Sequence, residues 1–500
     1  MNGTTTITED ISERVSNGRM LEQQWDLINW ELAQNYVNRL QSRIAKATQV
    51  GKKSTVKRLQ YLLTHSFYAK AMAVKKVTTN KGKKTAGIDG EIWSTKAAKM
   101  NAIKSLNCRN YRAKAVKRVF IEKKGTNKRR PLGIPCMYDR AMQALYTLSL
   151  EPISEITADR NSFGFRQGRC AQDACSEIFG VMSQKRAAKY ALEGDIKGCF
   201  DNISHKWLLD NIPMDKDILG QFLKAGYVYK GQMFPANEGA AQGSIIGPVL
   251  ANMTLDGLQE LLYSKFRITH REANKNKVNF IRYADDFIVT AATELVAQEA
   301  RALIAEFLKQ RGLELSEEKT VITHIDKGFD FLGWNFRKYR EKMIIMPSQK
   351  SVKSILTKIS ATIKDGVAME QDTLIARLNP IVRGWANYHQ SVCSKSTFQR
   401  IGHETFECLW KWAKRRHPNK GRGWKRHRYW QCRGTRSWVF ATDINTLCNP
   451  AYIPIVRHPR LKTELNPHLS KQYFIKRQKS LKLAKENAKR VSALNRVCNA

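Results

Sequence analysis

The sequence is poor in acidic residues, has no paired cysteine motifs and has no long apolar run. A transmembrane helix needs roughly 20 consecutive apolar residues, and no segment of the chain approaches that length. Residues 1–20 are polar and include acids, unlike a secretory signal or an Arg-rich presequence. We therefore expect no membrane partner and a cytoplasmic location.

Ten cysteines are scattered along the chain without a Cys-x-x-Cys pair. His389 lies four residues before Cys393, and His403 lies five residues before Cys408, but neither set has a second pair of ligands. These thiols are expected to be reduced, and no structural zinc is expected.

The charge balance is strongly basic, with 86 Lys and Arg against 44 Asp and Glu and a formal net charge of +42. Solubility alone needs far less charge. Attraction to a membrane would normally come with an amphipathic or spanning segment. Nucleic acid is therefore the expected partner, and binding should weaken steeply as salt rises.

Two adjacent carboxylates, Asp285 and Asp286, stand between the apolar stretches Val278–Ile281 and Phe287–Val289. This pattern predicts a β-hairpin with the acids at its tip. Like charges that close are costly without a cation, and a pair of divalent metals ~4 Å apart can hold the attacking and leaving oxygens of a phosphoryl transfer. An acidic solvated turn is the alternative, and the metal hypothesis needs a third carboxylate.

Asp195 is the candidate for that third carboxylate. It lies in a predicted strand, Tyr190–Ile196, and Ser204 is a suitable N-cap for the helix that follows. Between Asp195 and the acid pair, Gln242 and Gly243 precede an apolar run, where the backbone can approach a substrate closely.

The order of these motifs resembles the palm of a reverse transcriptase, and other segments extend the resemblance from about Trp25 nearly to the C-terminus. The sequence is similar to bacterial-type group II intron-encoded reverse transcriptase/maturases. The segments that carry this resemblance are RRPLGIPCMYDRAMQALYTLSLEP, NSFGFRQGRC, LSEEKT, GFDFLGWNF and, for the maturase domain, LNPIVRGWANYHQ.

The resemblance implies an α+β right-hand polymerase, with fingers and a palm built on an antiparallel sheet, then an α-helical thumb and a small basic C-terminal region. Many relatives continue into a His-Asn-His nuclease, but after Cys448 only Cys498, His458 and His468 remain as ligands. No nuclease domain, and no cleavage of the second DNA strand by this chain, is therefore expected. The predicted parts are a disordered tail (1–20), an N-terminal extension of the fingers (21–85), fingers and palm (86–345), the thumb or maturase domain (346–420) and a DNA-binding-like region (421–500).

The resemblance also implies roles for individual residues. The implied catalytic carboxylates are Asp195, Asp285 and Asp286, which with the Ile196 carbonyl would hold two Mg²⁺ ions. The implied dNTP contacts are Lys123, Arg130, Phe200, Gln242 and Lys319, and the expected RNA contacts are Arg383, Asn387, Arg415 and Arg416.

Three of the implied dNTP contacts have alternatives. Lys128 or Arg129 could contact the nucleotide in place of Lys123, Lys319 could be a plain surface lysine, and Phe200 could be only a core residue.

One motif departs from the family pattern of Pro-Gln-Gly-Gly, because Ala241 and Ser244 flank Gln242 and Gly243. The departure could affect rate or fidelity, but activity is still expected because the carboxylates and Phe200 are present.

Local helix signals are also readable. Thr293 predicts the start of a helix that stops at Gly312, and Asn379 predicts a cap for a helix opened by Pro380.

The implied function is an RNA-directed DNA polymerase that binds its group II intron RNA, promotes splicing and copies the intron by target-primed reverse transcription. Its partners would be intron RNA, a DNA target or primer, and dNTPs, in a bacterial ribonucleoprotein associated with the nucleoid. Two alternatives stay open: a splicing cofactor with vestigial polymerase activity, and a domesticated, free-standing reverse transcriptase of defence or repair.

Overall fold

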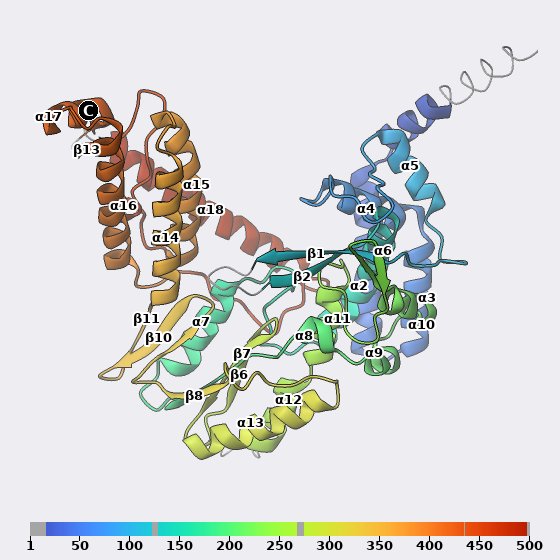
Figure 1. The fold of residues 1–500 in the computed structure, drawn as a ribbon. Coiled ribbons are helices and arrows are strands. Elements are labelled where there is room, and N and C mark those ends of the chain that lie inside the picture. The colour runs from blue at the N-terminus through green and yellow to red at the C-terminus, as the bar shows by residue number, and fades with distance from the viewer. Residues whose placement is uncertain (1–16, 123–128, 268–274, 435, 498–500) are drawn as a thin grey trace, which may run out of the picture.

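The computed structural model describes residues 17–122, 129–267, 275–434 and 436–497. The ribbon has the outline of a cupped hand (Figure 1). N-terminal helices form one side, C-terminal helices form the other, and a β-sheet lies at the base between them. Among the described residues, no helix is both long enough and apolar enough to cross a membrane.

A bundle of helices forms the N-terminal side of the hand. Residues 17–26 are helical, so the prediction of a disordered tail is wrong for residues 17–20, while residues 1–16 lie outside the described residues. The helices that follow are α2 (Trp30–Gln49), α3 (Lys53–His65), α4 (Phe67–Thr79) and α5 (Lys96–Ser105).

Side-chain caps and one long central helix organise this bundle. Asn29 accepts a hydrogen bond from the Leu32 amide at the start of α2, and Ser66 caps α4 in the same way. Both helices pack their apolar faces on α6 (Met137–Thr157), which is buried along most of its length.

The fingers sheet projects from this side of the hand (Figure 1). Its strand order is β2-β1-β4-β5, and β1 pairs antiparallel with β2 but parallel with β4. The strands are β1 (Val116–Glu122), β2 (Arg129–Ile134), β4 (Tyr227–Tyr229) and β5 (Gln232–Phe234).

The palm sheet has the order β6-β7-β3-β8, and every neighbouring pair is antiparallel. Its strands are β3 (Tyr190–Gly194), β6 (Asn279–Tyr283), β7 (Asp286–Ala291) and β8 (Val321–His324). The helices that pack on its strands are α7 (Ala171–Met182), α12 (Leu258–Phe266) and α13 (Glu294–Lys309). The other helices in this part of the chain are α8 (Cys199–Asn202), α9 (His205–Asn211), α10 (Lys216–Lys224) and α11 (Gly247–Leu255). The predicted α+β class with an antiparallel palm sheet is confirmed.

Both faces of the palm sheet are buried, which explains why its strands are continuously apolar. Successive side chains of a strand point to opposite faces. Phe280 and Val289 enter a core shared with the N-terminal helices, whereas Ile281 and Ile288 enter a second core with α7 and the next sheet. Thr293 caps α13 and Gly312 follows its end with a positive φ of 75°, as predicted.

A second antiparallel sheet leads from the palm to the helices on the other side of the hand. Its strands are β9 (Phe329–Phe331), β10 (Trp334–Tyr339) and β11 (Lys342–Pro347), and the helices are α14 (Gln349–Asp365), α15 (Gln371–His389) and α16 (Lys395–Arg416). These helices share a separate apolar core that includes Leu378 and Trp412.

Helix α15 corrects one prediction. Pro380 lies inside the helix, and Asn379 does not cap it. The Asn379 side chain instead accepts a hydrogen bond from the Cys448 amide and donates one to the Thr446 carbonyl. Packing of the apolar face of α15 outweighs the one backbone hydrogen bond that proline removes.

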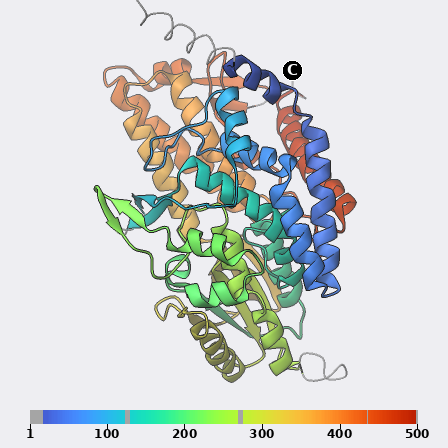
Figure 2. The same ribbon diagram turned by 90° about the vertical axis from the view of Figure 1, so that its right-hand side faces the viewer.

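The C-terminal region crosses back from the thumb to the palm and the N-terminal helices. Its elements are α17 (Arg422–Tyr429), β12 (Trp430–Arg433), β13 (Arg436–Phe440), η1 (Pro450–Tyr452) and α18 (Lys471–Val497). Figure 2 shows α18 beside the N-terminal helices, and the Ser42 hydroxyl donates to the His468 carbonyl at 2.8 Å.

Candidate active site

The turn between β6 and β7 carries the acid pair. Tyr283 and Asp286 are the last paired residues of the ladder, so Ala284 and Asp285 form the tip. The predicted hairpin is confirmed, with Asp286 as the first residue of β7. Ala284 has a φ of 58°, a left-handed conformation that costs an L-residue roughly 1–2 kcal/mol. The surrounding structure must therefore hold this turn in place.

Asp195 reaches the same site from the neighbouring strand. Gly194, the last residue of β3, pairs with Phe287, and a Cβ at Gly194 would lie 2.1 Å from the Phe287 ring. Only glycine allows the two strands this contact, which sets Asp195 beside the start of β7. The Asp195 carbonyl accepts a hydrogen bond from the Ser316 amide at 2.8 Å.

The backbone next to Asp195 also fits its predicted role. Ile196 forms an isolated antiparallel bridge with Leu315. The two hydrogen bonds of that bridge use the Asp195 carbonyl and the Lys197 amide. The Ile196 carbonyl is therefore left out of the bridge, and Ile196 lines the cleft described below.

The three carboxylates repel one another. Burial raises the pKa of Asp285, and the nearby charge of Asp195 raises it further. Burial also raises the pKa of Asp286 to about 7, together with the charges of Asp285 and Asp195 and a hydrogen bond with Asp195. Because the three carboxylates lie close together, each makes the negative charge of the others less favourable. A hard divalent cation such as Mg²⁺, which binds oxygen ligands, would stabilise these charges.

A cleft of about 1430 Å³ opens beside these carboxylates. Asp195 and Asp285 line it, together with four of the five predicted dNTP contacts: Arg130, Phe200, Gln242 and Lys319. The fifth, Lys123, lies outside the described residues. The Lys319 ammonium is 2.5 Å from an Asp195 carboxylate oxygen, so its positive charge already faces the acids.

The segment of residues 241–244, which differs from the family pattern of Pro-Gln-Gly-Gly, has defined hydrogen bonds in the structure. The Gln242 carbonyl accepts a hydrogen bond from the Gly133 amide at 2.7 Å, and a Cβ at Gly243 would lie 2.6 Å from the Gly133 carbonyl oxygen. The Ser244 hydroxyl accepts a hydrogen bond from the Gly247 amide at 3.0 Å, at the start of α11. The extra side chain at Ser244 therefore bonds the first amide of α11, and Ser244 is not among the residues that line the cleft.

The four predicted RNA contacts lie on α15 and α16, apart from the residues that line the cleft. Arg383, Asn387 and Arg415 are exposed. Arg416 is half-buried, and its guanidinium donates to the carbonyls of Val367 and Met369 at 3.0 and 2.6 Å. Arg416 therefore holds the loop between α14 and α15, a role that the sequence did not indicate.

Sequence reasoning missed two buried polar clusters. The first surrounds Arg282, directly before the acid turn, and its signal was an arginine inside an otherwise apolar strand. The second joins Cys170, Asp173 and His458, whose ligand atoms lie within 4.8 Å of one another. Arg477 also donates to Asp173 and supplies the positive charge there, and burial raises the pKa of the Cys170 thiol to about 11.

Comparison with protein families gives three matches that together follow the chain. Residues 25–106 match the N-terminal domain of reverse transcriptase, and residues 121–336 match reverse transcriptase (RNA-dependent DNA polymerase). Residues 352–430 match the group II intron, maturase-specific domain.

Curated relatives agree with these matches. The chain is 33% identical to the group II intron-encoded protein LtrA of Lactococcus lactis, over 60% of each protein. It is 27% identical to protein YkfC of Escherichia coli, over 61% of this chain and 90% of that protein. A telomerase structure from Candida albicans aligns with 11% identity and a TM-score of 0.37 over 62% of this chain and 63% of that chain, an overlap too low to carry an argument. The chain thus spans about 60% of the length of LtrA.

Proposed function

Since this chain belongs to the reverse transcriptase family and carries a group II intron maturase-specific domain, we propose that it is an RNA-directed DNA polymerase that also serves its intron. In this proposal it binds group II intron RNA, promotes splicing and copies the intron by target-primed reverse transcription. The observation that supports the polymerase activity is that Asp195, Asp285 and four of the five predicted nucleotide contacts line one cleft.

The chemistry is the attack of a primer 3′-hydroxyl on the α-phosphate of a dNTP. Asp195, Asp285 and the Ile196 carbonyl would hold two Mg²⁺ ions, with Asp286 in support. When bound, such ions lower the pKa of the attacking hydroxyl and stabilise charge on the phosphate oxygens. Arg130 and Lys319 reach the same cleft, where their charges would neutralise the leaving pyrophosphate. Gln242, which also lines this cleft, would contact the nucleotide.

The maturase half rests on the match over residues 352–430 and on the net charge of +42. Intron RNA would contact exposed cations of the thumb, among them Arg383 and Arg415, together with Asn387. The particle would be a cytoplasmic ribonucleoprotein associated with the nucleoid. A free-standing enzyme of defence or repair would need no such RNA, so failure to bind the intron RNA encoded around the gene would favour that alternative.

The polymerase proposal is tested by removing the acid pair. Asp285→Asn with Asp286→Asn should abolish cDNA synthesis on a primed RNA template, because metal charge is then uncompensated. The control replaces two exposed acids, Asp210→Asn with Asp365→Asn, and should extend the primer at the wild-type rate. Undiminished extension by the first variant would refute the site.

A further inference from the structure

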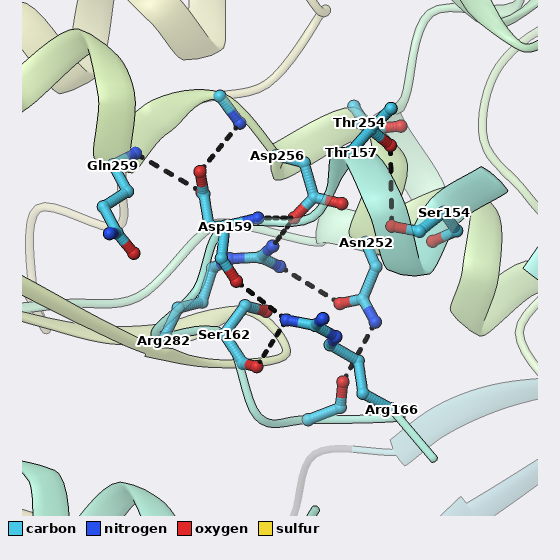
Figure 3. A network of polar contacts seen from close by, with 12 residues as sticks. Ser154, Thr157, Asp159, Ser162, Arg166, Asn252, Thr254, Asp256, Gln259 and Arg282 are labelled. Carbon is cyan, nitrogen blue, oxygen red and sulfur yellow. Dashed lines mark hydrogen bonds and ion pairs between the residues drawn. The ribbon is translucent and has the colours of Figure 1, made fainter. Parts of the chain in front are cut away.

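A buried arginine, Arg282, lies directly before the turn that presents Asp285, and Figure 3 shows its contacts with Asp256 and Asn252. The Arg282 side chain is 1% exposed, and its guanidinium donates to the carbonyl of Ala284 at 3.3 Å. Ala284 is the residue with the left-handed φ of 58°. Arg282 thus bonds the one backbone group of the turn whose conformation is strained.

Two further contacts confine the same turn. A Cβ at Gly164 would lie 2.3 Å from the Ala284 nitrogen, so the Gly164 backbone is pressed against the tip. The Asn252 side chain donates to the Gly164 carbonyl at 2.9 Å and accepts from Arg282 at 3.1 Å. One asparagine on α11 therefore ties the arginine to the segment that presses on the turn, and Figure 3 shows this connection.

The guanidinium is itself fixed from the other side. Its second nitrogen forms an ion pair with Asp256, whose side chain is 5% exposed. Asp159 accepts hydrogen bonds from the amides of Gly257 and Gln259, which anchors the start of α12 beside that pair. Arg282 therefore cannot move without breaking a buried ion pair, and it transmits the position of α11 and α12 to the metal-binding turn.

We propose that Arg282, held by Asp256 and Asn252, is a positioning residue that sets the orientation of the Asp285 carboxylate by fixing the carbonyl of Ala284. This inference rests on the proposed polymerase function and adds a determinant of metal affinity to it. Groups that orient a metal ligand without touching the metal typically change affinity about 10–100-fold when they are lost. A residue that only stabilised the core would change unfolding and leave metal affinity unaltered.

Arg166 provides the matched control. It is also a buried arginine paired with a buried acid, Glu155, at 2.7 Å. Its remaining hydrogen bonds go to the carbonyls of Asp159 and Ser162. Arg166→Lys should therefore destabilise the fold, and because Arg166 does not itself bond Ala284, it should weaken Mn²⁺ binding much less than Arg282→Lys does.

The experiment measures metal binding, activity and stability on the full chain with a primed RNA template. Mn²⁺ binding is followed by the electron paramagnetic resonance signal of the free ion, and the Mg²⁺ concentration for half-maximal extension is measured in parallel. Arg282→Lys should weaken Mn²⁺ binding and raise the Mg²⁺ requirement by about tenfold or more, with the maximal rate largely restored at saturating metal. The temperature of thermal unfolding, measured in the presence of a chelator, should fall by a similar amount in Arg282→Lys and Arg166→Lys.

A second variant covers the case in which Arg282→Lys does not fold. Asn252→Ala leaves the Arg282–Asp256 ion pair intact and removes the two hydrogen bonds that tie Arg282 to the Gly164 carbonyl, so it should remain folded yet bind Mn²⁺ more weakly. Metal affinities equal to wild type in a folded Arg282→Lys or in Asn252→Ala, or an equal loss in Arg166→Lys, would overturn the proposal. If the wild-type chain does not extend the primer, the polymerase function fails, while the Mn²⁺ titration still decides the role of Arg282.

Discussion

The Phe200 side chain has two sets of neighbours. Its ring lines the cleft beside Asp195, and it also packs edge-to-face on Phe165 with the ring centroids 6.1 Å apart. We propose that this ring lies beneath the sugar of the bound nucleotide, where it would clash with a 2′-hydroxyl, so Phe200→Val should raise incorporation of rNTP relative to dNTP on the order of tenfold or more. The ratio is measured by single-nucleotide extension.

The control for this prediction is Phe165→Leu, which removes the same ring contact without emptying the position of Phe200. It should leave sugar selectivity unchanged. A ratio that stays at the wild-type value in Phe200→Val would show that this ring only packs.

His389 at the end of α15 predicts a pH dependence of stability. Burial lowers its pKa to about 4, and its Nε2 lies 3.0 Å from the Ser351 hydroxyl. The unfolded chain therefore takes up the proton first as pH falls. The contribution of His389 to the free energy of unfolding is therefore fully present above about pH 6.5 and is lost as the pH falls toward 4, by at most about 3 kcal/mol. His389→Gln should flatten this decline, as measured by urea unfolding between about pH 7 and pH 4.5. Parallel pH profiles for the two proteins would contradict it.

At the scale of elements, two adjacent arginines at the end of α16 have the same predicted role but different surroundings. Arg415 is exposed, so Arg415→Glu should weaken intron RNA binding roughly threefold to tenfold at low salt without changing unfolding. Arg416 bonds the loop after α14, so Arg416→Glu should cost about 1–2 kcal/mol of unfolding free energy. Filter binding across a salt series and urea unfolding measure the two effects. Equal behaviour of the two variants would contradict the assignment.

Local signals predicted some elements and misled at one. The caps at Ser204 and Thr293 were readable because the capping group and its amide partner lie three residues apart. Asn379 before Pro380 gave an equally good signal, yet the partners of Asn379 lie at Thr446 and Cys448. A cap signal is decided by tertiary contacts when the side chain has better partners far along the chain.

At the scale of the whole molecule, the C-terminal region is tied to the palm. His458 and Arg477 both bond Asp173 of α7, and Arg460 lies 3.4 Å from Glu177 on the same helix. The composition of residues 421–500 predicted a DNA-binding region, but it could not show that its second half returns to the palm. The α7 contacts constrain how freely the thumb can move relative to the palm.

Separation along the sequence also explains which parts of the active site were predictable. The acids were found because Asp285 and Asp286 are adjacent and Asp195 ends an apolar strand. The support beneath them was not found, because an arginine inside an apolar strand indicates a buried partner but does not identify it, and Asp256 lies 26 residues before Arg282. A sequence motif identifies the groups that do the chemistry, whereas the groups that hold them come from elements joined only by the fold.

Splicing and DNA synthesis should therefore be separable. The acids occupy one local site, while RNA recognition in our proposal is spread over basic surfaces of the N-terminal extension and the thumb, so Asp285→Asn with Asp286→Asn should leave intron RNA binding intact. Losing two negative charges from a chain of net charge +42 cannot weaken its attraction to RNA. We expect this variant to splice a precursor RNA containing the flanking intron within about twofold of wild type, while it makes no cDNA. Arg415→Glu should show the reverse order of defects. Loss of splicing in the acid variant, with its unfolding unchanged, would mean that RNA recognition and synthesis share one site.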